Sequence, residues 1–292
     1  MNPRFSLIVP TLNRLDDMRR LFVSIQQGTL QDLEVIVIDQ NDGPLLDALC
    51  AEFKTVFPLR HEKIKPAGVA HARNHGFQFA TGEILNFPDD DCELTPDLLQ
   101  QVSDRFAAKA DLDMLFGCAV DRETLTRSVT RFSEQAQPVT AGNVFSTTVE
   151  FTMFLKRQVW LDVGGLDEKL GVGTYFGAEE GSDFVLRALY MKKQLHYDPA
   201  LLFYHAQKVG RYDTKEFARA FSYGRGFGRL TVKHLLKLRQ ISALIRFLNF
   251  QARACAAVLI FAAQFKFSKS RYYLQTILGR IVGVFRSLPE FL

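Results

Sequence analysis

"FSLIVPTLNRLDDMRRLFVSIQQGTLQDLEVIVID", residues 5–39, joins two short apolar runs through a segment with helical periodicity. The runs FSLIV (5–9) and LEVIVID (33–39) are rich in Val, Ile and Leu, which is typical of strands buried on both faces of a sheet. The apolar residues between the two runs recur at helical spacing, at Met18, Leu21, Phe22 and Ile25. This stretch therefore predicts a strand, a helix and a second strand.

The same alternation continues along the chain. PLLDALCAEF (44–53) and VAHARNHGFQFA (69–80) predict two further helices, and EILNF (83–87) predicts another strand. Repeated strand and helix units favour an α/β fold with a mainly parallel central sheet covered on both faces. In such folds, ligands bind at the carboxyl ends of the strands.

Charged residues are distributed unevenly along the 292 residues. Residues 211–292 contain 15 Lys and Arg against three Asp and Glu, a net charge of +12, whereas residues 1–210 contain 21 against 29, a net charge of −8. This asymmetry predicts a body at 1–210 and a basic helical extension at 211–292. The four cysteines are scattered without Cys-x-x-Cys spacing, which favours a reducing, cytoplasmic compartment.

Three consecutive aspartates, Asp89, Asp90 and Asp91, follow the predicted strand EILNF. They are not needed to cap the next helix, because Thr95 can be its N-cap, Pro96 its first residue and Asp97 part of its first turn. Adjacent carboxylates repel one another unless a cation lies between them. Mg²⁺ and Mn²⁺ bind carboxylate oxygens together with substrate phosphates, so this edge of the sheet is a candidate metal–diphosphate site.

Four stretches, in order, resemble the family 2 inverting glycosyltransferases. They are SLIVPTLNR, EVIVIDQND, GVAHARNHGFQFATGEILNFPDDD and VGGLDEKLGVGTYFGAEEGSDFVLRAL, and the resemblance covers roughly residues 4–206. It implies a Rossmann-like GT-A nucleotide-diphospho-sugar transferase fold. It also implies transfer of a sugar, with inversion and with Mg²⁺ or Mn²⁺, from a nucleotide-sugar donor, most often a UDP-sugar, to an acceptor hydroxyl.

The resemblance assigns donor-binding roles to several residues. Asp39 would accept a hydrogen bond from the base or ribose, although Gln40, Asn41 and Asp42 depart from the family's usual continuation. Arg73 would face the nucleotide, and Asn13 is either a donor contact or a helix N-cap. The complete donor set is Pro10, Thr11, Asn13, Asp39, Arg73, Asp89 and Asp90, and the metal ligands would be Asp91, Asp89 and His205.

The second acidic stretch, GAEEGSDFVLRAL (177–189), contains the candidate residues for acid–base chemistry. A base must remove the proton of the acceptor hydroxyl, and a carboxylate near other acids can have the raised pKa that suits this task. Glu180 is the first candidate and Glu179 the second. Asp183 is a further candidate, although an acid at a helix N-terminus also stabilises the helix dipole. Gly164 and Gly165 match the Gly-Gly turn that precedes this region in the family.

The C-terminal extension mixes aromatic, aliphatic and basic residues, as an interfacial helix does. Its charge-free run ACAAVLIFAAQF (254–265) is only 12 residues long, short of the roughly 18 needed to cross a bilayer, which favours a buried or interfacial helix. We expect peripheral attachment to the inner face of a bacterial cell membrane. Packing on the body and homo-oligomerisation remain the alternatives. The chain carries no recognised nucleic-acid module, and GRGFG (224–228) lacks the spacing and preceding strand of a dinucleotide site.

Taken together, the sequence predicts addition of a single sugar to a glycan or lipid-linked acceptor in surface polysaccharide synthesis. The chain lacks the Gln-x-x-Arg-Trp motif of processive synthases. Two alternatives remain open: a noncatalytic membrane-associated nucleotide-sugar-binding protein, and a nucleotidyltransferase.

Overall fold

The computed structural model describes residues 2–129, 132–207 and 212–292. The chain forms two compact units. The first comprises Met1–Ala67, His71–Leu166 and Phe184–Lys208, and the second comprises Gly68–Ala70, Asp167–Asp183 and Val209–Leu292. The domain boundary predicted at residues 210 and 211 lies outside the described residues. The second unit combines a loop segment from the middle of the chain with the C-terminal helices.

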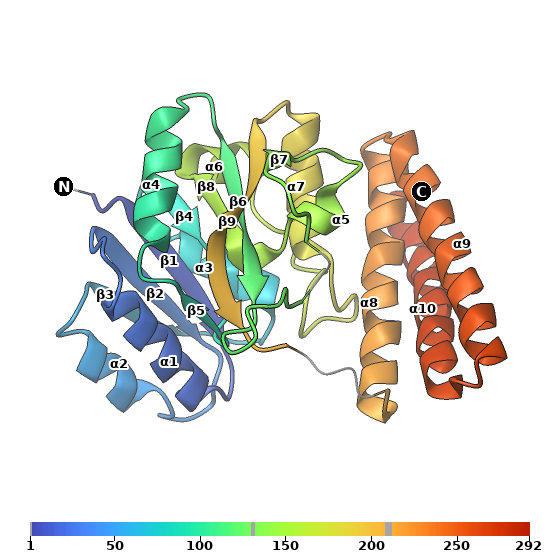
Figure 1. Ribbon diagram of the computed structural model, residues 1–292, viewed down its shortest axis with the longest axis horizontal. Coiled ribbons are helices and arrows are strands. Elements are labelled where there is room, and N and C mark those ends of the chain that lie inside the picture. Colours follow the sequence, from blue (N-terminus) through green and yellow to red (C-terminus); the bar gives the residue numbers. More distant parts are fainter. Residues whose placement is uncertain (1, 130–131, 208–211) are drawn as a thin grey trace. The chain divides into compact units, whose positions relative to one another are not determined.

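The first unit is built on a mixed sheet with the strand order β3-β2-β1-β4-β8-β6-β9-β5, and β7 pairs with β9 (Figure 1). The strands are β1 (Phe5–Thr11), β2 (Leu33–Asp39), β3 (Leu59–Lys63), β4 (Ile84–Asn86), β5 (Cys92–Leu94), β6 (Met114–Val120), β7 (Gln137–Pro138), β8 (Met153–Lys156) and β9 (Leu195–His205). The strands from β3 to β4 are parallel, whereas β8 runs antiparallel between β4 and β6. The α/β fold is confirmed, and its sheet is parallel on the β3 side and mixed beyond β4.

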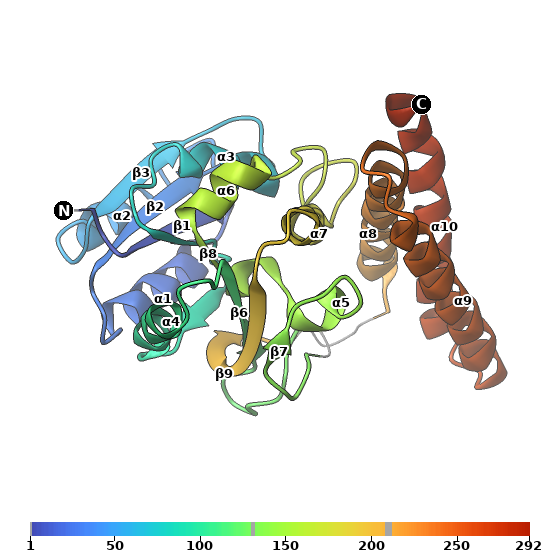
Figure 2. The ribbon, with the colours of Figure 1, turned by 90° about the horizontal axis from the view of Figure 1, so that it is seen from above.

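Helices cover both faces of this sheet. They are α1 (Leu15–Gln26), α2 (Asp47–Phe53), α3 (Val69–Phe77), α4 (Leu98–Ala108), α5 (Val144–Thr147), the 3₁₀ turn η1 (Glu150–Thr152), α6 (Arg157–Val163) and α7 (Glu180–Tyr190). α1 and α4 lie on one face, and α3 and α6 lie on the other (Figure 2). α3 approaches so closely that a Cβ built on Gly76 would lie 2.4 Å from Cγ2 of Ile8. The core between these layers is formed by fully buried strand residues such as Leu7, Val9 and Val37.

The start of α4 differs from the sequence-based expectation. α4 begins at Leu98 with Asp97 as its N-cap, and no side chain caps it. Thr95, the expected cap, instead donates its hydroxyl hydrogen bond to the carbonyl of Leu202, 3.0 Å away on β9. The capping prediction was therefore wrong, because a tertiary contact with β9 holds the threonine before the helix begins.

The second unit contains the C-terminal helices α8 (Thr214–Val232), α9 (Ile241–Ala263) and α10 (Phe267–Phe291), with the π-helical turn η2 (Lys233–Lys237) after α8. α8 and α10 pack backbone to backbone through glycines. A Cβ on Gly228 would lie 2.3 Å from the carbonyl oxygen of Arg280, and a Cβ on Gly283 would lie 2.3 Å from that of Arg225. GRGFG is therefore a packing motif: Gly224 and Gly228 face Gly279 and Gly283 of α10, whereas Gly226 faces Ala178.

α9 is mostly uncovered within this unit. Its length of 23 residues and its mean hydropathy of 1.5 would allow it to cross a membrane, which by itself is weak evidence of a span. Only 6% of its apolar window is buried, so of the two expected readings, a buried or an interfacial helix, this burial favours the interfacial one. Leu259 and Ile260 are 71% and 53% exposed. The interfacial reading of the apolar stretch stays a prediction.

Candidate active site

The loops after β1 and β2 meet at the carboxyl edge of the sheet. Register pairs Thr11 with Asp39, so the two loops leave the sheet side by side. Pro10 fits inside β1 because β4 pairs with β1 only as far as Leu7, which leaves one edge of the strand unpaired at the proline. Thr11 and Asp39 are buried at this edge, as expected for residues that follow buried strands.

Asn13 is held by the neighbouring loop rather than used as a helix cap. α1 begins at Leu15 and its N-cap is Arg14, so the capping alternative for Asn13 was wrong. Asn13 has φ of 59°, a left-handed conformation that asparagine tolerates better than most residues. Its backbone N–H donates to Oδ1 of Asn41 over 2.8 Å. The loop after β1 is thereby fixed to the loop after β2.

Asp39 organises this edge through both carboxylate oxygens. Its Oδ1 accepts hydrogen bonds from the backbone N–H and side-chain amide of Asn41, at 2.8 and 2.6 Å. Its Oδ2 lies 2.9 Å from Nε2 of His61 on β3. Asp39 is fully buried, so a base or ribose could contact it only after its neighbours moved. The donor role of Asp39 stays a prediction.

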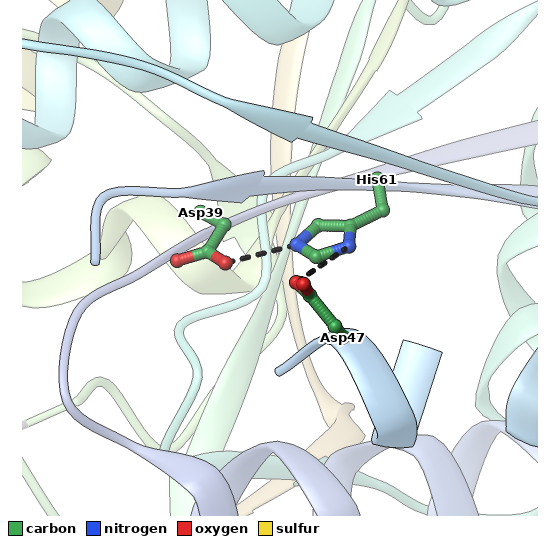
Figure 3. A group of neighbouring side chains, drawn as sticks. All are labelled: Asp39, Asp47 and His61. Atoms are coloured by element: carbon green, nitrogen blue, oxygen red, sulfur yellow. Dashed lines mark hydrogen bonds and ion pairs between the residues drawn. The ribbon is translucent and has the colours of Figure 1, made fainter. Parts of the chain in front are cut away.

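Asp39, His61 and Asp47 form a group that the sequence reasoning missed (Figure 3). One potential ligand atom from each lies within 4.8 Å of the others, close enough for a metal ion. The two carboxylates, however, face different nitrogens of His61, since Nδ1 is 4.0 Å from Asp47. Asp47 also pairs with Nζ of Lys63 at 2.7 Å. These contacts fit a histidine bridging two acids better than three ligands converging on one ion.

The aspartates at 89–91 are brought to His205 by a very short strand. β5 begins directly after them, at Cys92, and runs antiparallel to the end of β9, with Cys92 opposite His205. As a result, Oδ1 of Asp91 lies 3.4 Å from Nε2 of His205. The sequence proposed these residues as common metal ligands, and the structure brings Asp91 and His205 together.

The orientation of His205 suits a metal ligand. Its ring is 4% exposed and stacks on Phe151, with centroids 5.3 Å apart. Nδ1 lies 2.8 Å from the carbonyl oxygen of Ala206, a bond in which the ring nitrogen must be the donor. In the neutral imidazole, Nε2 then directs a lone pair at the Asp91 carboxylate. A histidine fixed by a backbone carbonyl and facing a carboxylate is typical of divalent-metal sites, so these residues fit Mg²⁺ or Mn²⁺.

Two arginines lie close to the aspartates. Nη2 of Arg73, a buried side chain, lies 2.8 Å from Oδ1 of Asp89. Arg14 is 3.8 Å from Asp91 and binds Asp17 more closely, at 2.9 Å. Burial raises the pKa of Asp90 to about 7; the Thr11 hydroxyl opposes this shift, and the charges of Asp89 and Asp91 add to it. The three adjacent carboxylates therefore repel one another, and a divalent cation would relieve this repulsion.

The second acidic stretch lies at the start of α7, in the second unit. Glu180 and Asp183 both fall in the first turn of this helix. The carboxyl group of Glu180 is buried close to Gly171, where a Cβ would lie 2.9 Å from its Cδ. Glu179 precedes the helix with φ of 79°, an unusual conformation for a glutamate.

Asp183 is part of a buried charge network. Its Oδ1 lies 2.7 Å from Nζ of Lys233 and 3.0 Å from Nε2 of His234. Lys233 also pairs with Asp167 at 3.0 Å. Asp183 and His234 are fully buried. The sequence offered Asp183 as a base or a helix-stabilising acid, and these contacts favour a structural role; its part in catalysis stays untested.

Arg229 extends the same network. It pairs with Asp167 at 3.3 Å and with Glu290 at 2.7 Å, and Lys169 pairs with Glu290 at 2.9 Å. Among the described residues, the network includes Asp167, Lys169, Asp183, Arg229, Lys233, His234 and Glu290. The sequence reasoning missed it, because its acids and cations lie far apart in the chain.

The Gly-Gly turn before this region forms as expected. Gly164 ends α6 with φ of 83°, and Gly165 follows with φ of 72°. Arg187 of α7 donates hydrogen bonds to the carbonyls of Val163 and Gly165. The glycines are therefore required by a left-handed turn that α7 holds in place.

Comparison with known proteins identifies the family of this chain. The sequence profile of glycosyl transferase family 2 matches residues 6–159. A curated relative is the GalNAc(5)-diNAcBac-PP-undecaprenol beta-1,3-glucosyltransferase of Campylobacter jejuni, which is 30% identical over 128 residues. That match covers 41% of this chain and 40% of the relative, so it spans less than two thirds of the relative's length.

Solved structures share the fold. The mannosyltransferase PcManGT from Pyrobaculum calidifontis, in complex with GDP-Man and Mn²⁺, superposes with a TM-score of 0.63 at 19% identity, covering 96% of this chain and 88% of that one. S. aureus TarS 1–349 in complex with UDP-GlcNAc gives a TM-score of 0.60 at 17% identity, covering 97% and 92%. The predicted GT-A type of fold is confirmed.

Proposed function

We propose, from the premise that this chain belongs to glycosyl transferase family 2, that it is a metal-dependent inverting enzyme acting on a lipid-linked acceptor. Family membership makes the chain a glycosyltransferase, and its relatives include an enzyme whose name specifies a PP-undecaprenol-linked substrate. The predicted enzyme is thereby confirmed, and the noncatalytic alternative is not retained. Metal dependence, inversion and the acceptor belong to the proposal.

One observation supports metal dependence above the others: His205 is oriented by the Ala206 carbonyl so that Nε2 faces Asp91. Asp91, Asp89 and His205 would hold Mg²⁺ or Mn²⁺. A divalent cation there would supply positive charge for the donor diphosphate as it leaves. Asp90 would share the cation or contact the ribose. The buried guanidinium of Arg73 pairs with Asp89, and Arg73 would contact the nucleotide, as the family resemblance implies.

The proposed reaction is a direct displacement at the anomeric carbon. Glu180 accepts the proton of the acceptor hydroxyl, whose oxygen forms the new glycosidic bond as the bond to the nucleoside diphosphate breaks. The nucleoside diphosphate departs with the bonding electrons, and attack from the opposite face inverts the configuration. Glu179 is the second candidate for the base. A UDP-sugar is the proposed donor.

The proposed location is the inner face of a bacterial cell membrane. The extension at 211–292 has a net charge of +12, and its helices expose apolar side chains such as Ile245, Leu259 and Phe285. Basic residues near an anionic surface contribute about 1 kcal/mol each, and exposed apolar residues add burial at the headgroup boundary. Sedimentation with anionic and neutral liposomes, at low and high salt, tests this location.

The deciding experiment is a panel of nucleotide sugars assayed for binding and hydrolysis with Mn²⁺, with Mg²⁺ and with a chelator. We expect one donor to bind in a metal-dependent way and to release a nucleoside diphosphate. Release of pyrophosphate would instead identify a nucleotidyltransferase. Asp91→Asn should abolish metal-dependent binding, whereas Asp104→Asn, at an exposed carboxylate of α4, should not change it. Equal donor and metal binding by Asp91→Asn and the unmutated protein would refute the metal assignment.

A further inference from the structure

A cavity of about 620 Å³ lies in the second unit, outside the residues discussed for the donor. Its volume falls within the roughly 300–1,000 Å³ of small-molecule sites. Its walls come from the loop before α7 and from the C-terminal part of α10, and its lining consists of Lys169, Thr174, Tyr175, Phe176 and Arg286. The loop belongs to the same segment as the proposed base Glu180.

Two of the lining residues are aromatic. The rings of Tyr175 and Phe176 meet edge to face, with centroids 5.0 Å apart, and Tyr175 is 46% exposed. The guanidinium of Arg225 lies 4.0 Å from the centroid of the Tyr175 ring, which fixes the position of that ring. The cavity therefore offers a firm apolar wall to a ligand with an apolar part.

The two charged residues that line the cavity, Lys169 and Arg286, are both cations. Lys169 is paired with Glu290, which also binds Arg229. The other acids of the network, Asp167 and Asp183, are likewise paired with cations. Arg286, in contrast, is exposed and makes no ion pair among the described residues. Guanidinium groups bind phosphate through paired N–H donors, so Arg286 can take an anionic ligand without breaking an existing contact.

We propose that this cavity binds the phosphate-bearing part of an amphiphilic acceptor, with Arg286 on the phosphate and Tyr175 and Phe176 against its apolar portion. The proposal rests on the function proposed above, because it specifies where a lipid-linked acceptor is held. A phosphate joined to an apolar chain satisfies both the cation and the aromatic wall, which neither a free phosphate nor a neutral lipid does. The loop that forms one wall also leads into the helix that carries Glu180.

The test is equilibrium binding of farnesyl diphosphate to the full chain by calorimetry, with inorganic pyrophosphate and farnesol as comparison ligands. A chelator is present throughout, so that Asp89 and Asp91 cannot attract the diphosphate through a metal ion. We expect farnesyl diphosphate to bind more tightly than either comparison ligand. Arg286→Ala should weaken its binding roughly 10- to 100-fold, the usual value of charge-assisted hydrogen bonds. Arg286→Lys should recover part of this loss.

Lys266→Ala provides the matched control, since Lys266 is an exposed cation at the other end of α10 whose side chain donates a hydrogen bond to Gln264. Equal binding by Arg286→Ala and Lys266→Ala would overturn the proposal, and so would equal binding of pyrophosphate and farnesyl diphosphate. Donor binding is measured separately on each variant. If no nucleotide sugar binds while Arg286 still determines farnesyl diphosphate affinity, the proposed function fails and the lipid-phosphate site stands.

Discussion

The two units of this protein each contain a group of acidic side chains, in opposite surroundings. At the edge of the sheet, Asp89, Asp90 and Asp91 are adjacent, and burial together with mutual repulsion raises the pKa of Asp90 to about 7. In the helical unit, Asp167 and Asp183 each lie within 3.3 Å of a cationic side chain. In the first group like charges lie side by side, and a cationic ligand would relieve their repulsion, whereas each acid of the second group faces a cation of the protein.

This difference separates a binding site from a structural element. Adjacent carboxylates raise one another's pKa, and groups with such perturbed pKa values gather at functional sites. Buried carboxylates with matching cations hold elements together, and removing one partner is strongly destabilising. The proposed base, Glu180, is close in sequence to the second group, because it precedes Asp183 by three residues in the first turn of α7.

The largest expected effect is on transfer by Glu180→Gln. If Glu180 is the base, transfer should fall roughly 10²- to 10⁴-fold, while the affinity for the donor stays unchanged. Steady-state transfer and donor binding, measured on the same variant, check both statements. Glu179→Gln is the matched control and should cause a smaller loss. Near-normal transfer by Glu180→Gln would move the role to Glu179 or Asp183.

The second prediction contrasts the stability of two aspartate variants. Asp183→Asn removes a buried carboxylate from Lys233 and His234 and should lower the free energy of unfolding by about 3 kcal/mol. Asp91→Asn reduces repulsion within its cluster and should change that free energy by no more than about 0.5 kcal/mol. Urea unfolding followed by circular dichroism measures both. Similar losses in the two variants would refute the distinction between the clusters.

The sequence predicted the strands and helices at the start of the chain well, because their apolar runs are long and their periodicity is clear. It named Asp91 and His205 together only through the family resemblance. The strand that joins them, β5, has three residues, Cys92–Leu94, too few to show any periodicity. A pairing between residues more than one hundred positions apart cannot be derived from such a short segment.

The role of Asp183 could not be derived from the sequence for a related reason. Its partners Lys233 and His234 follow about fifty residues later, and nothing near Asp183 in the sequence indicates them. The glycines of GRGFG are similar, since Gly224 and Gly228 acquire their packing role from α10, which follows some fifty residues later. Charge counts located the basic extension but gave no information on which of its cations are already paired.

The third prediction tests how tightly α8 and α10 pack in the helical unit. Gly228→Ala places a methyl group 2.3 Å from the carbonyl oxygen of Arg280 and 2.6 Å from the amide nitrogen of Val284. The helices must separate, which should cost about 1–3 kcal/mol of unfolding free energy. Gly43→Ala is the control, because a Cβ there meets nothing within 4 Å. Equal stability of the two variants in urea would show that α8 and α10 can accommodate a methyl group at Gly228 without separating.

The smallest expected effect is the pH dependence contributed by Glu290. A hydrogen bond from Arg229 is the main reason that the pKa of Glu290 falls to about 2, from 4.5 for a free glutamate. Because the folded pKa is the lower one, the ion pair stabilises the fold above about pH 4.5, and this stabilisation is lost as the pH falls towards 2. The Glu290 side chain is 38% exposed, so solvent screening limits the contribution to about 1 kcal/mol.

Glu290→Gln should therefore be less stable than the unmutated protein at neutral pH, and the difference should shrink steadily on acidification. Unfolding free energies measured from pH 7 to the acid limit of folding check this trend. Glu123→Gln, at an exposed glutamate of the first unit, should show no such convergence. A difference that stays constant with pH would mean that the ion pairs of Glu290 with Arg229 and Lys169 do not contribute to the stability of the fold. The charges of Arg229 and Lys169 would then be less fully neutralised than their distances to Glu290 indicate. In that case, the absence of an ion pair at Arg286 among the described residues would no longer set it apart from these two cations.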